Sequence, residues 1–451
     1  MSNAPPERLG SRGKIGLFEA IAANILQMVG VGPFLTIPLI LSAMGGPQAM
    51  VGWGLGALIS ACDGLVWAEL GAAMPGSGGS YKYLREAYGP RSLGQLMSFI
   101  FLFQSIVVTP LLAASGGVGF ADYAKSLYPA MTYWQGKAVA FAVCLVATAL
   151  LYRNIRSIGR VSMVLVTIVM GTMVWIIVAG ATHFNPALAF AFPPGAFHPS
   201  AAFFTGLGAA TLIAMYDYQG YCTAALIGDE VKAPNRNLPR SILLAIGIVA
   251  IGYTAMSFSV IGVIPWKETL TSTSIVSDLI GRVYGPTAAK VSAVLVLLAA
   301  FGSVFAVLLG FSRVPYAAAL EGNFFSIFAR VHPKGFPSFS IVFMGVASAC
   351  ACLFSLESLI DGLIIVQILT QFAAQCVAVV LIRRYRKDIQ RPFRMYLYPL
   401  PVVIALAGWV FIVVSAQARY ILFGMCVLVA AVIAFLIRAR SRSEWPLSKV
   451  A

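Results

Sequence analysis

The chain has 451 residues, of which 59% are hydrophobic and only 10% are charged, and its mean hydropathy is +0.87. Because a soluble domain carries about 25% charged residues, this composition excludes an ordinary soluble enzyme, a disordered chain and a secreted disulfide scaffold. It indicates that lipid surrounds most of the chain. The net charge of +15 does not indicate a nucleic acid partner, because the basic residues lie between apolar runs and form no patch.

Twelve apolar segments approach the length of about 20 residues that a membrane-spanning helix needs. In chain order, these predicted spans cover residues 18–43, 48–72, 94–121, 138–152, 161–181, 201–227, 240–264, 288–319, 338–355, 359–382, 399–417 and 420–437. They predict an all-α integral membrane protein with about 12 transmembrane helices.

The basic residues divide unequally between the two sides that these spans define. With the N-terminus inside, 25 of the 31 Lys and Arg residues fall in inside segments, and 6 fall in outside segments. Such an excess is typical of cytoplasmic loops. We therefore expect a multi-pass protein of the cytoplasmic (inner) membrane, with both termini in the cytoplasm and its basic loops facing anionic membrane lipid.

Two spans carry residues that interrupt helices near their middle. They are Gly30-Val31-Gly32-Pro33 in the first span and Tyr216-Asp217-Tyr218-Gln219-Gly220 in the sixth. Backbone groups freed at membrane depth must be satisfied by protein, water or a ligand. A packing kink would explain one such break. Breaks in the first helix of each set of five are typical of inverted repeats that bind substrate where discontinuous helices meet.

Two tails, a core of two repeats and a pair of appended helices make up the expected organisation. The boundaries are residues 1–17 for the N-terminal tail, 18–382 for the core (repeats at about 18–181 and 201–382), 399–437 for the appended helices and 438–451 for the C-terminal tail. The seven cysteines lie inside apolar segments without the spacing of a zinc or haem site, so we expect no metal and no cofactor.

Five stretches carry a resemblance to a known family. They are residues 30–34 in span 1, 68–70 with 75–81 after span 2, 216–221 with 229–240 around span 6, 312–317 with 321–322 at the end of span 8, and 391–394 with 398–399 before span 11. In this order and spacing, the chain resembles the amino acid permease family of the amino acid–polyamine–organocation (APC) superfamily. The resemblance implies a leucine-transporter-like 5+5 inverted repeat with broken helices 1 and 6.

The function that the resemblance implies is a secondary active transporter that moves amino acids by alternating access, through proton-coupled symport or exchange. A polyamine or another cationic amine is the alternative substrate. The sequence carries no nucleotide-binding fingerprint of a primary pump. It also lacks the clustered His, Asp or Cys residues of a membrane-embedded enzyme, so no enzymatic activity is expected.

The implied substrate site lies at the two breaks. Backbone N–H groups around the first break would bind the substrate carboxylate. Val31 replaces the usual serine and Pro33 has no N–H group, so donors are lost, and Thr36 is expected to compensate. Close helix packing is the alternative role of the glycines. The expected substrate-binding residues are Gly30, Val31, Gly32, Phe34, Thr36, Tyr216, Asp217, Tyr218, Gly220 and Ser303.

Asp217 is the most informative of these residues, because a carboxylate near the centre of the bilayer is costly and functional by default. It could bind a substrate amine, accept the coupling proton or cap the broken helix. Tyr216 matches the aromatic residue that covers the substrate in relatives; an ordinary core position is the alternative.

Three carboxylates are candidates for proton coupling or gating: Asp217, Asp63 and Glu69. Glu69 is expected near the cytoplasmic exit, where pairing with an inner-loop arginine is its alternative role. Asp63 lies about 9 Å farther along the same helix, at about 1.5 Å per residue, and is a candidate proton relay. Ser303 matches a hydroxyl position of sodium-coupled relatives. Residues 161–180 lack the lysine of several proton-coupled relatives, so proton and sodium both remain candidates for the coupling ion.

Overall fold

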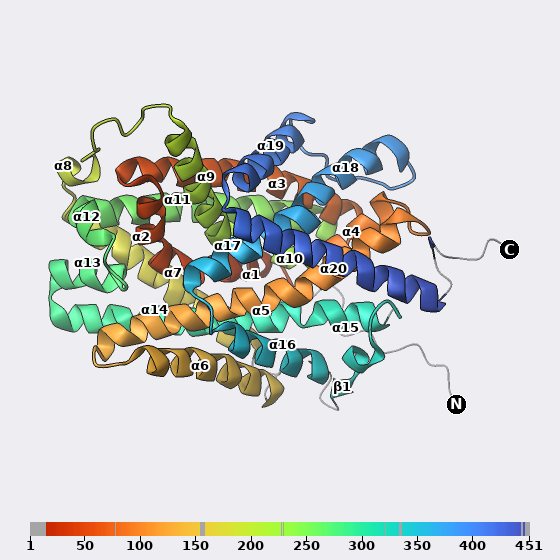
Figure 1. The fold of residues 1–451 in the computed structure, drawn as a ribbon, viewed down its shortest axis with the longest axis horizontal. Coiled ribbons are helices and arrows are strands. Elements are labelled where there is room, and N and C mark those ends of the chain that lie inside the picture. Colours follow the sequence, from red (N-terminus) through yellow and green to blue (C-terminus); the bar gives the residue numbers. More distant parts are fainter. Residues whose placement is uncertain are drawn as a thin grey trace.

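A computed structural model of the chain describes residues 15–76, 78–153, 158–226, 228, 230–320, 322–332, 336–442 and 445–446. Most of the predicted N-terminal tail and half of the predicted C-terminal tail lie outside the described residues, as do Ser77, Asp229 and Glu321 of the motifs. The described chain is almost entirely helical (Figure 1). The prediction of an all-α protein is therefore confirmed.

Each of the twelve predicted spans has a helical counterpart in the described chain. In chain order they are α1 (Leu17–Met28) with α2 (Gly32–Met44), α3 (Met50–Ala73), α5 (Leu93–Leu127), α6 (Tyr133–Arg153), α7 (Ile158–Thr182), α9 (Ala201–Tyr218) with α10 (Thr223–Leu226), α11 (Pro234–Val263), α14 (Pro286–Phe311) with α15 (Arg313–Leu320), α16 (Ser338–Ala351), α17 (Leu356–Gln367) with the π-helix η4 (Ile368–Phe372) and α18 (Ala373–Tyr385), α19 (Leu400–Ser415) and α20 (Ala418–Arg442).

The remaining elements are short and connect these spans. They are η1 (Pro47–Ala49), α4 (Ser80–Ala87), α8 (Pro186–Ala189), α12 (Trp266–Thr269), α13 (Ile275–Tyr284), η3 (Ser326–Ala329) and the antiparallel strands β1 (Val331–His332) and β2 (Phe336–Pro337). In Figure 1, α8, α12 and α13 lie at the left end of the bundle, and α4 and α15 lie at the right end. The connections therefore alternate between two sides, as twelve spans require.

Most of the helices are long and apolar, which explains why the hydropathy of the sequence was sufficient to predict the spans. Among the described residues, eight helices are long and apolar enough to cross a membrane, nine if α1 and α2 count as one broken span, and α16 and α19 are shorter apolar helices. Several predicted ends were wrong. The helix predicted over 94–121 runs from Leu93 to Leu127, and the one predicted over 138–152 begins at Tyr133. These helices continue into polar turns beyond the apolar run, which hydropathy does not detect.

The first span breaks at residues 29–31, slightly before the predicted position. Helix α1 ends at Met28, α2 begins at Gly32, and the two axes differ by 47°. Pro33 therefore stands in the first turn of α2, where a missing N–H breaks no helical hydrogen bond.

The break in the sixth span was predicted at residues 216–220, and that placement is wrong by about one turn. Tyr216, Asp217 and Tyr218 are the last residues of α9. The chain then extends at Gln219 (φ −62°, ψ 144°) and turns at Gly220, whose φ is +113°. After the break, α10 forms a single turn that ends at Leu226, one residue before the predicted end of this span.

Helices from the two halves of the chain pack on one another as pairs. Contacts join α2 with α9, α3 with α11, α5 with α14 and α6 with α16. These are spans 1 with 6, 2 with 7, 3 with 8 and 4 with 9, which are equivalents in the predicted repeats. The pairing favours a pseudo-twofold arrangement, and the division into residues 18–181 and 201–382 stays a prediction.

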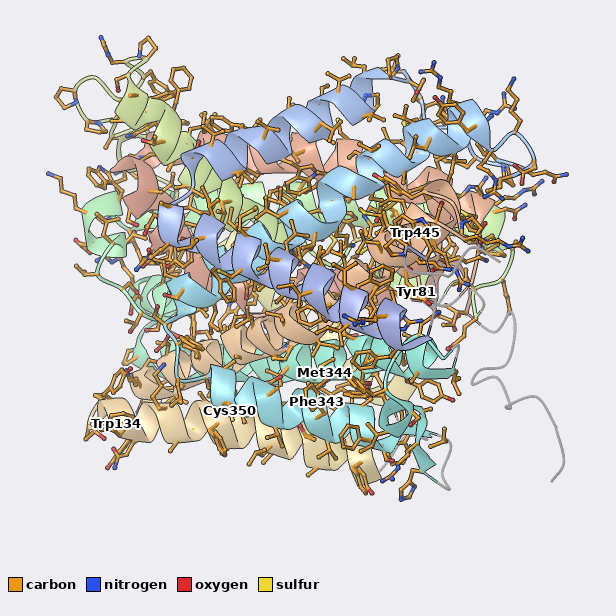
Figure 2. All side chains as sticks on the ribbon, turned by 45° about the vertical axis from the view of Figure 1, so that its right-hand side comes forward. Tyr81, Trp134, Phe343, Met344, Cys350 and Trp445 are labelled. Carbon is orange, nitrogen blue, oxygen red and sulfur yellow. The ribbon has the colours of Figure 1, made fainter. Side chains whose placement is uncertain are left out.

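Large apolar side chains cover the outer faces of the bundle. Ile251, Val414 and Leu422 are each exposed by two thirds or more in the absence of lipid. Trp134, labelled near one end of α6 in Figure 2, is 72% exposed. Tryptophan at a span end is typical of the membrane interface. The exposed apolar surface therefore matches a protein surrounded by lipid.

Candidate functional site

The two breaks meet where α2 begins and α9 ends. Asp217 Oδ1 lies so close to Gly32 that a Cβ atom there would collide with it, and a Cβ at Gly30 would collide with the Ser303 hydroxyl. Thr36 donates a hydrogen bond to Asp217 Oδ2. The structure thus brings Asp217 together with Gly32 and Thr36, and Ser303 together with Gly30. At both positions the absence of a Cβ atom lets the side chain of another helix lie close to the backbone.

Asp217 is buried and carries one unpaired oxygen. Its exposed fraction is 1%, and that of Thr36 is 0%. Within the described chain, Asp217 Oδ1 has no hydrogen-bond partner. The carboxylate lies beside the first turn of α2, whose N–H groups and dipole favour negative charge. Asp217 is therefore a buried carboxylate at the junction of the two breaks, and its role in binding stays a prediction.

Tyrosines from other helices hold the broken ends. The Tyr253 hydroxyl lies 2.7 Å from the carbonyl oxygen of Met28 and 3.2 Å from that of Asp217, at the ends of α1 and α9. The Tyr123 hydroxyl donates to the Phe34 carbonyl at 2.8 Å. The Tyr253 hydroxyl thus satisfies a carbonyl group that a helix end leaves unpaired. The Phe34 carbonyl lies in the first turn of α2 and has no helical partner because Pro38, four residues later, has no N–H group. Sequence analysis missed both tyrosines, because no local pattern shows which distant carbonyl a buried tyrosine will reach.

Tyr216 and Tyr218, adjacent to Asp217, point in different directions. The Tyr216 hydroxyl lies 2.8 Å from the hydroxyl of Ser115 in α5, so it ties the sixth span to the third. The Tyr218 ring packs edge-on against Trp53, with ring centroids 5.9 Å apart, and is fully buried. Its surroundings are those of a core residue. The predicted covering role of Tyr216 stays a prediction.

Glutamines surround a small cavity beside the second break. The cavity has a volume of about 30 Å³, enough for at least one water molecule. Its polar lining comes from Gln27, Gln219, Gln367 and Gln371. Gln219 donates to Gln367, and Gln104 donates to Gln371 at 2.9 Å. Sequence analysis missed this cluster. The recurrence of glutamine every four residues at 367, 371 and 375 inside an apolar span was the available signal.

The same region contains an irregular stretch of helix. Residues 368–372 form a π-helix, and this stretch includes Gln371 and Phe372, both of which line the cavity. π-Helical bulges inside α-helices are frequent at functional sites. The irregular helix and the polar cavity lie at the same place in the bundle.

Asp63 does not contact Asp217 but lies at the other side of the sixth-span break. It is fully buried in α3. The Tyr221 hydroxyl donates to Asp63 Oδ2 at 2.6 Å, and the Cys376 thiol lies 3.7 Å from Oδ1. Both partners are neutral. Asp63 forms no ion pair with any described side chain.

Glu69 forms a structural ion pair. Arg383 of α18 binds its carboxylate with two nitrogens, with Nε 2.8 Å from Oε1. Arg391 lies 3.8 Å away, and the Met395 N–H donates at 2.8 Å. The alternative role was pairing with an inner-loop arginine, and the structure has such a pair, with Arg383 in the last turn of α18 rather than in a loop. Gating by Glu69 stays a prediction.

The described part of the chain contains no group of three or more His, Cys, Asp or Glu side chains that could hold a metal ion. This geometry identifies two broken helices, a buried carboxylate between them and a polar cavity, but not a family. A comparison with family models decides that point: the model of the amino acid permeases matches residues 15–443.

The chain belongs to the amino acid permease family.

Named relatives of the permease include transporters from bacteria and mammals. The serine/threonine exchanger SteT of Bacillus subtilis is 25% identical over 424 residues, which cover 90% of the permease and 91% of the exchanger. The cystine/glutamate transporter of Homo sapiens is 25% identical over 404 residues, covering 87% and 79%. The Asc-type amino acid transporter 1 of Mus musculus is 26% identical over 428 residues, covering 90% and 77%. The permease is therefore a multi-pass membrane transporter of amino acids, as the resemblance implied.

The remaining predicted residues of the permease contribute backbone or packing at the breaks. Val31 and Phe34 are buried, and the Val31 side chain faces Gly119 of α5. Gly220 contacts Gln27 of α1. Of the predicted residues, Glu69 alone lies away from the breaks, while Tyr218 packs into the core and Asp63 lies at the far side of the second break. The role of the others in binding stays a prediction.

Proposed function

We propose that the two breaks form the central substrate site of the permease. An amino acid binds there with its carboxylate toward backbone N–H groups near Gly30 and its ammonium group toward Asp217. The observation that carries this proposal is Asp217 Oδ1, a buried carboxylate oxygen with no donor among the described residues. An unpaired buried acceptor is costly, and a substrate ammonium group supplies the missing donor.

The amine contact dominates substrate affinity in this proposal. Pro33 has no N–H group, and the Phe34 N–H donates to the Val31 carbonyl at 3.1 Å. The first turn of α2 therefore offers a carboxylate fewer donors than an unmodified helix start would. This shortage supports a site that relies on Asp217, and it keeps a polyamine or cationic amine as the alternative substrate.

Transport proceeds by alternating access across the cytoplasmic membrane, with both termini in the cytoplasm. The asymmetric distribution of Lys and Arg supports this orientation. The packing of equivalent spans against each other supports movement of one repeat relative to the other. Symport with a proton and exchange of amino acids both fit this scheme. Sodium is the alternative ion, with the half-buried Ser303 beside the first break as its candidate ligand.

A thermal-shift screen of the purified permease tests the substrate class. The ligands are the twenty amino acids and common polyamines, each at acidic and neutral pH and with and without sodium. A ligand that binds the folded state raises the melting temperature by mass action. We expect stabilisation by neutral amino acids. Stabilisation by polyamines alone would replace the proposed substrate with the alternative, and a requirement for sodium would contradict proton coupling.

A further inference from the structure

Asp63 is a buried carboxylate that substrate binding leaves without a role. It lies in α3, is fully buried and faces the second break rather than Asp217. Ionisable residues inside a membrane-spanning helix are expensive and mark ion or proton pathways by default. The purely structural alternative is an acid retained only to bind the Tyr221 hydroxyl.

Among the described residues, the groups that face Asp63 are neutral donors. Tyr221 and Cys376 contact its two oxygens, and Cys62 and Cys222 are the other titratable groups beside it. The indole rings of Trp67 and Trp409 also face it, and neither buried indole N–H has a hydrogen-bond partner in the described chain. No Lys, Arg, His or second carboxylate pairs with Asp63 among these residues. A lone carboxylate in such surroundings can exist either as an ion that accepts hydrogen bonds or as a neutral acid.

Asp63 also has a route to water. Tyr221, which donates to Asp63, lines the glutamine cavity together with Trp67 and Cys222. The cavity is large enough for at least one water molecule. An excess proton that this water carries as hydronium can therefore pass to the Tyr221 oxygen while the Tyr221 hydroxyl proton moves to Asp63 Oδ2, and a neutral water molecule remains. The carboxylate becomes a carboxylic acid, Tyr221 is unchanged, and release is the reverse.

From this geometry we infer that Asp63 is the proton-binding site of the permease and that it acts on the substrate site through Tyr221. The inference rests on the proposed function, in which the breaks bind the amino acid. Tyr221 follows Gly220 directly, and Gly220 contacts Gln27 of α1, so a change at Tyr221 reaches both broken spans. Ionised Asp63 only accepts a hydrogen bond from Tyr221, whereas the neutral acid also carries a proton to donate. The position of the break thus depends on the bound proton.

The test uses the full-length permease in proteoliposomes. It compares wild type with Asp63→Asn, which mimics the protonated acid permanently. The control is Asp361→Asn, which removes a half-buried carboxylate of α17 whose charged neighbours are Glu357 and Arg419. Counterflow of a labelled amino acid measures exchange from acidic to mildly alkaline pH, and an enclosed pH dye measures proton movement driven by the same amino acid.

For wild type and Asp361→Asn, we expect exchange that depends on pH and proton movement that depends on substrate. For Asp63→Asn, we expect exchange to persist, its pH dependence to be lost and proton movement to be absent. A wild-type pH profile with proton movement in Asp63→Asn would overturn the inference. Absence of substrate-linked proton movement in wild type would overturn it as well.

Two further measurements keep the result interpretable. The thermal-shift screen measures whether amino acids still bind Asp63→Asn. Loss of substrate binding and loss of proton binding are therefore distinguishable. Tyr221→Phe keeps the ring and removes only the hydroxyl. This variant tests the same relay if Asp63→Asn does not fold. We expect Tyr221→Phe to move the midpoint of the pH profile, and an unmoved midpoint would contradict the relay.

Discussion

At the scale of single residues, the site depends on close approaches that only glycine permits. Gly32 lets the Asp217 carboxylate lie against the start of α2, where Thr36 also reaches it. Gly220 combines a φ of +113° with contact to the backbone of Gln27. Sequence analysis could place both glycines in the site from their position in apolar spans. It could not show that Gly32 faces Asp217, because the two residues are 185 positions apart.

Gly220→Ala tests whether this turn is needed. An alanine would have to adopt an unfavourable φ, at a cost of about 1–3 kcal/mol, and its Cβ would collide with Gln27. We expect a lower melting temperature and loss of counterflow exchange. The matched control is Gly247→Ala in α11, where an added Cβ meets nothing within 4 Å. The control should be unchanged or slightly more stable, because alanine favours helix. Equal stability of both variants would contradict the role of Gly220.

At the scale of elements, Glu69 joins α3 to α18 and to the loop that precedes α19. Its carboxylate is 1% exposed and Arg383 is 15% exposed, so the pair is largely shielded from solvent. Family motifs placed Glu69 at the end of span 2, and the ion pair was weighed as the alternative to gating. Only the structure identifies Arg383 as the partner, because 314 residues separate the two.

Glu69→Gln is expected to destabilise the permease. Removing one partner of a buried ion pair leaves the other charge uncompensated, at a cost of about 3–5 kcal/mol. The control is Glu268→Gln, which breaks an ion pair with Arg282 whose side chains are 47% and 55% exposed. Such exposed pairs contribute about 0–1 kcal/mol. Thermal unfolding in detergent measures both variants, and an equal effect of the two substitutions would contradict a structural role for Glu69.

The glutamine cluster illustrates what element-level patterns leave undetected. The spacing of Gln367, Gln371 and Gln375 places them on one helix face, so a shared partner could have been expected. Neither the cavity nor the π-helix at residues 368–372 follows from that spacing. Both depend on how α17 and η4 pack against α5, and on how α17 packs against α9, which are properties of the tertiary structure.

At the scale of the whole molecule, hydropathy and the positions of basic residues were sufficient to predict the twelve spans. They succeed because lipid requires long apolar helices. The ends of those helices were less predictable, since α5 and α6 continue beyond their apolar runs. The tyrosine contacts to broken helix ends join distant parts of the chain, so they needed the folded structure.

In the proposed function, the amino acid binds between the two breaks and depends on the Asp217 carboxylate. Counterflow exchange by reconstituted wild type, Asp217→Asn and the control Asp361→Asn tests it most directly. Asparagine keeps the shape of the side chain but removes its charge, so the ammonium group of the substrate loses its partner. We predict that Asp217→Asn folds and reconstitutes like wild type but exchanges no amino acid, while Asp361→Asn exchanges normally. Wild-type exchange kinetics in Asp217→Asn would contradict the claim.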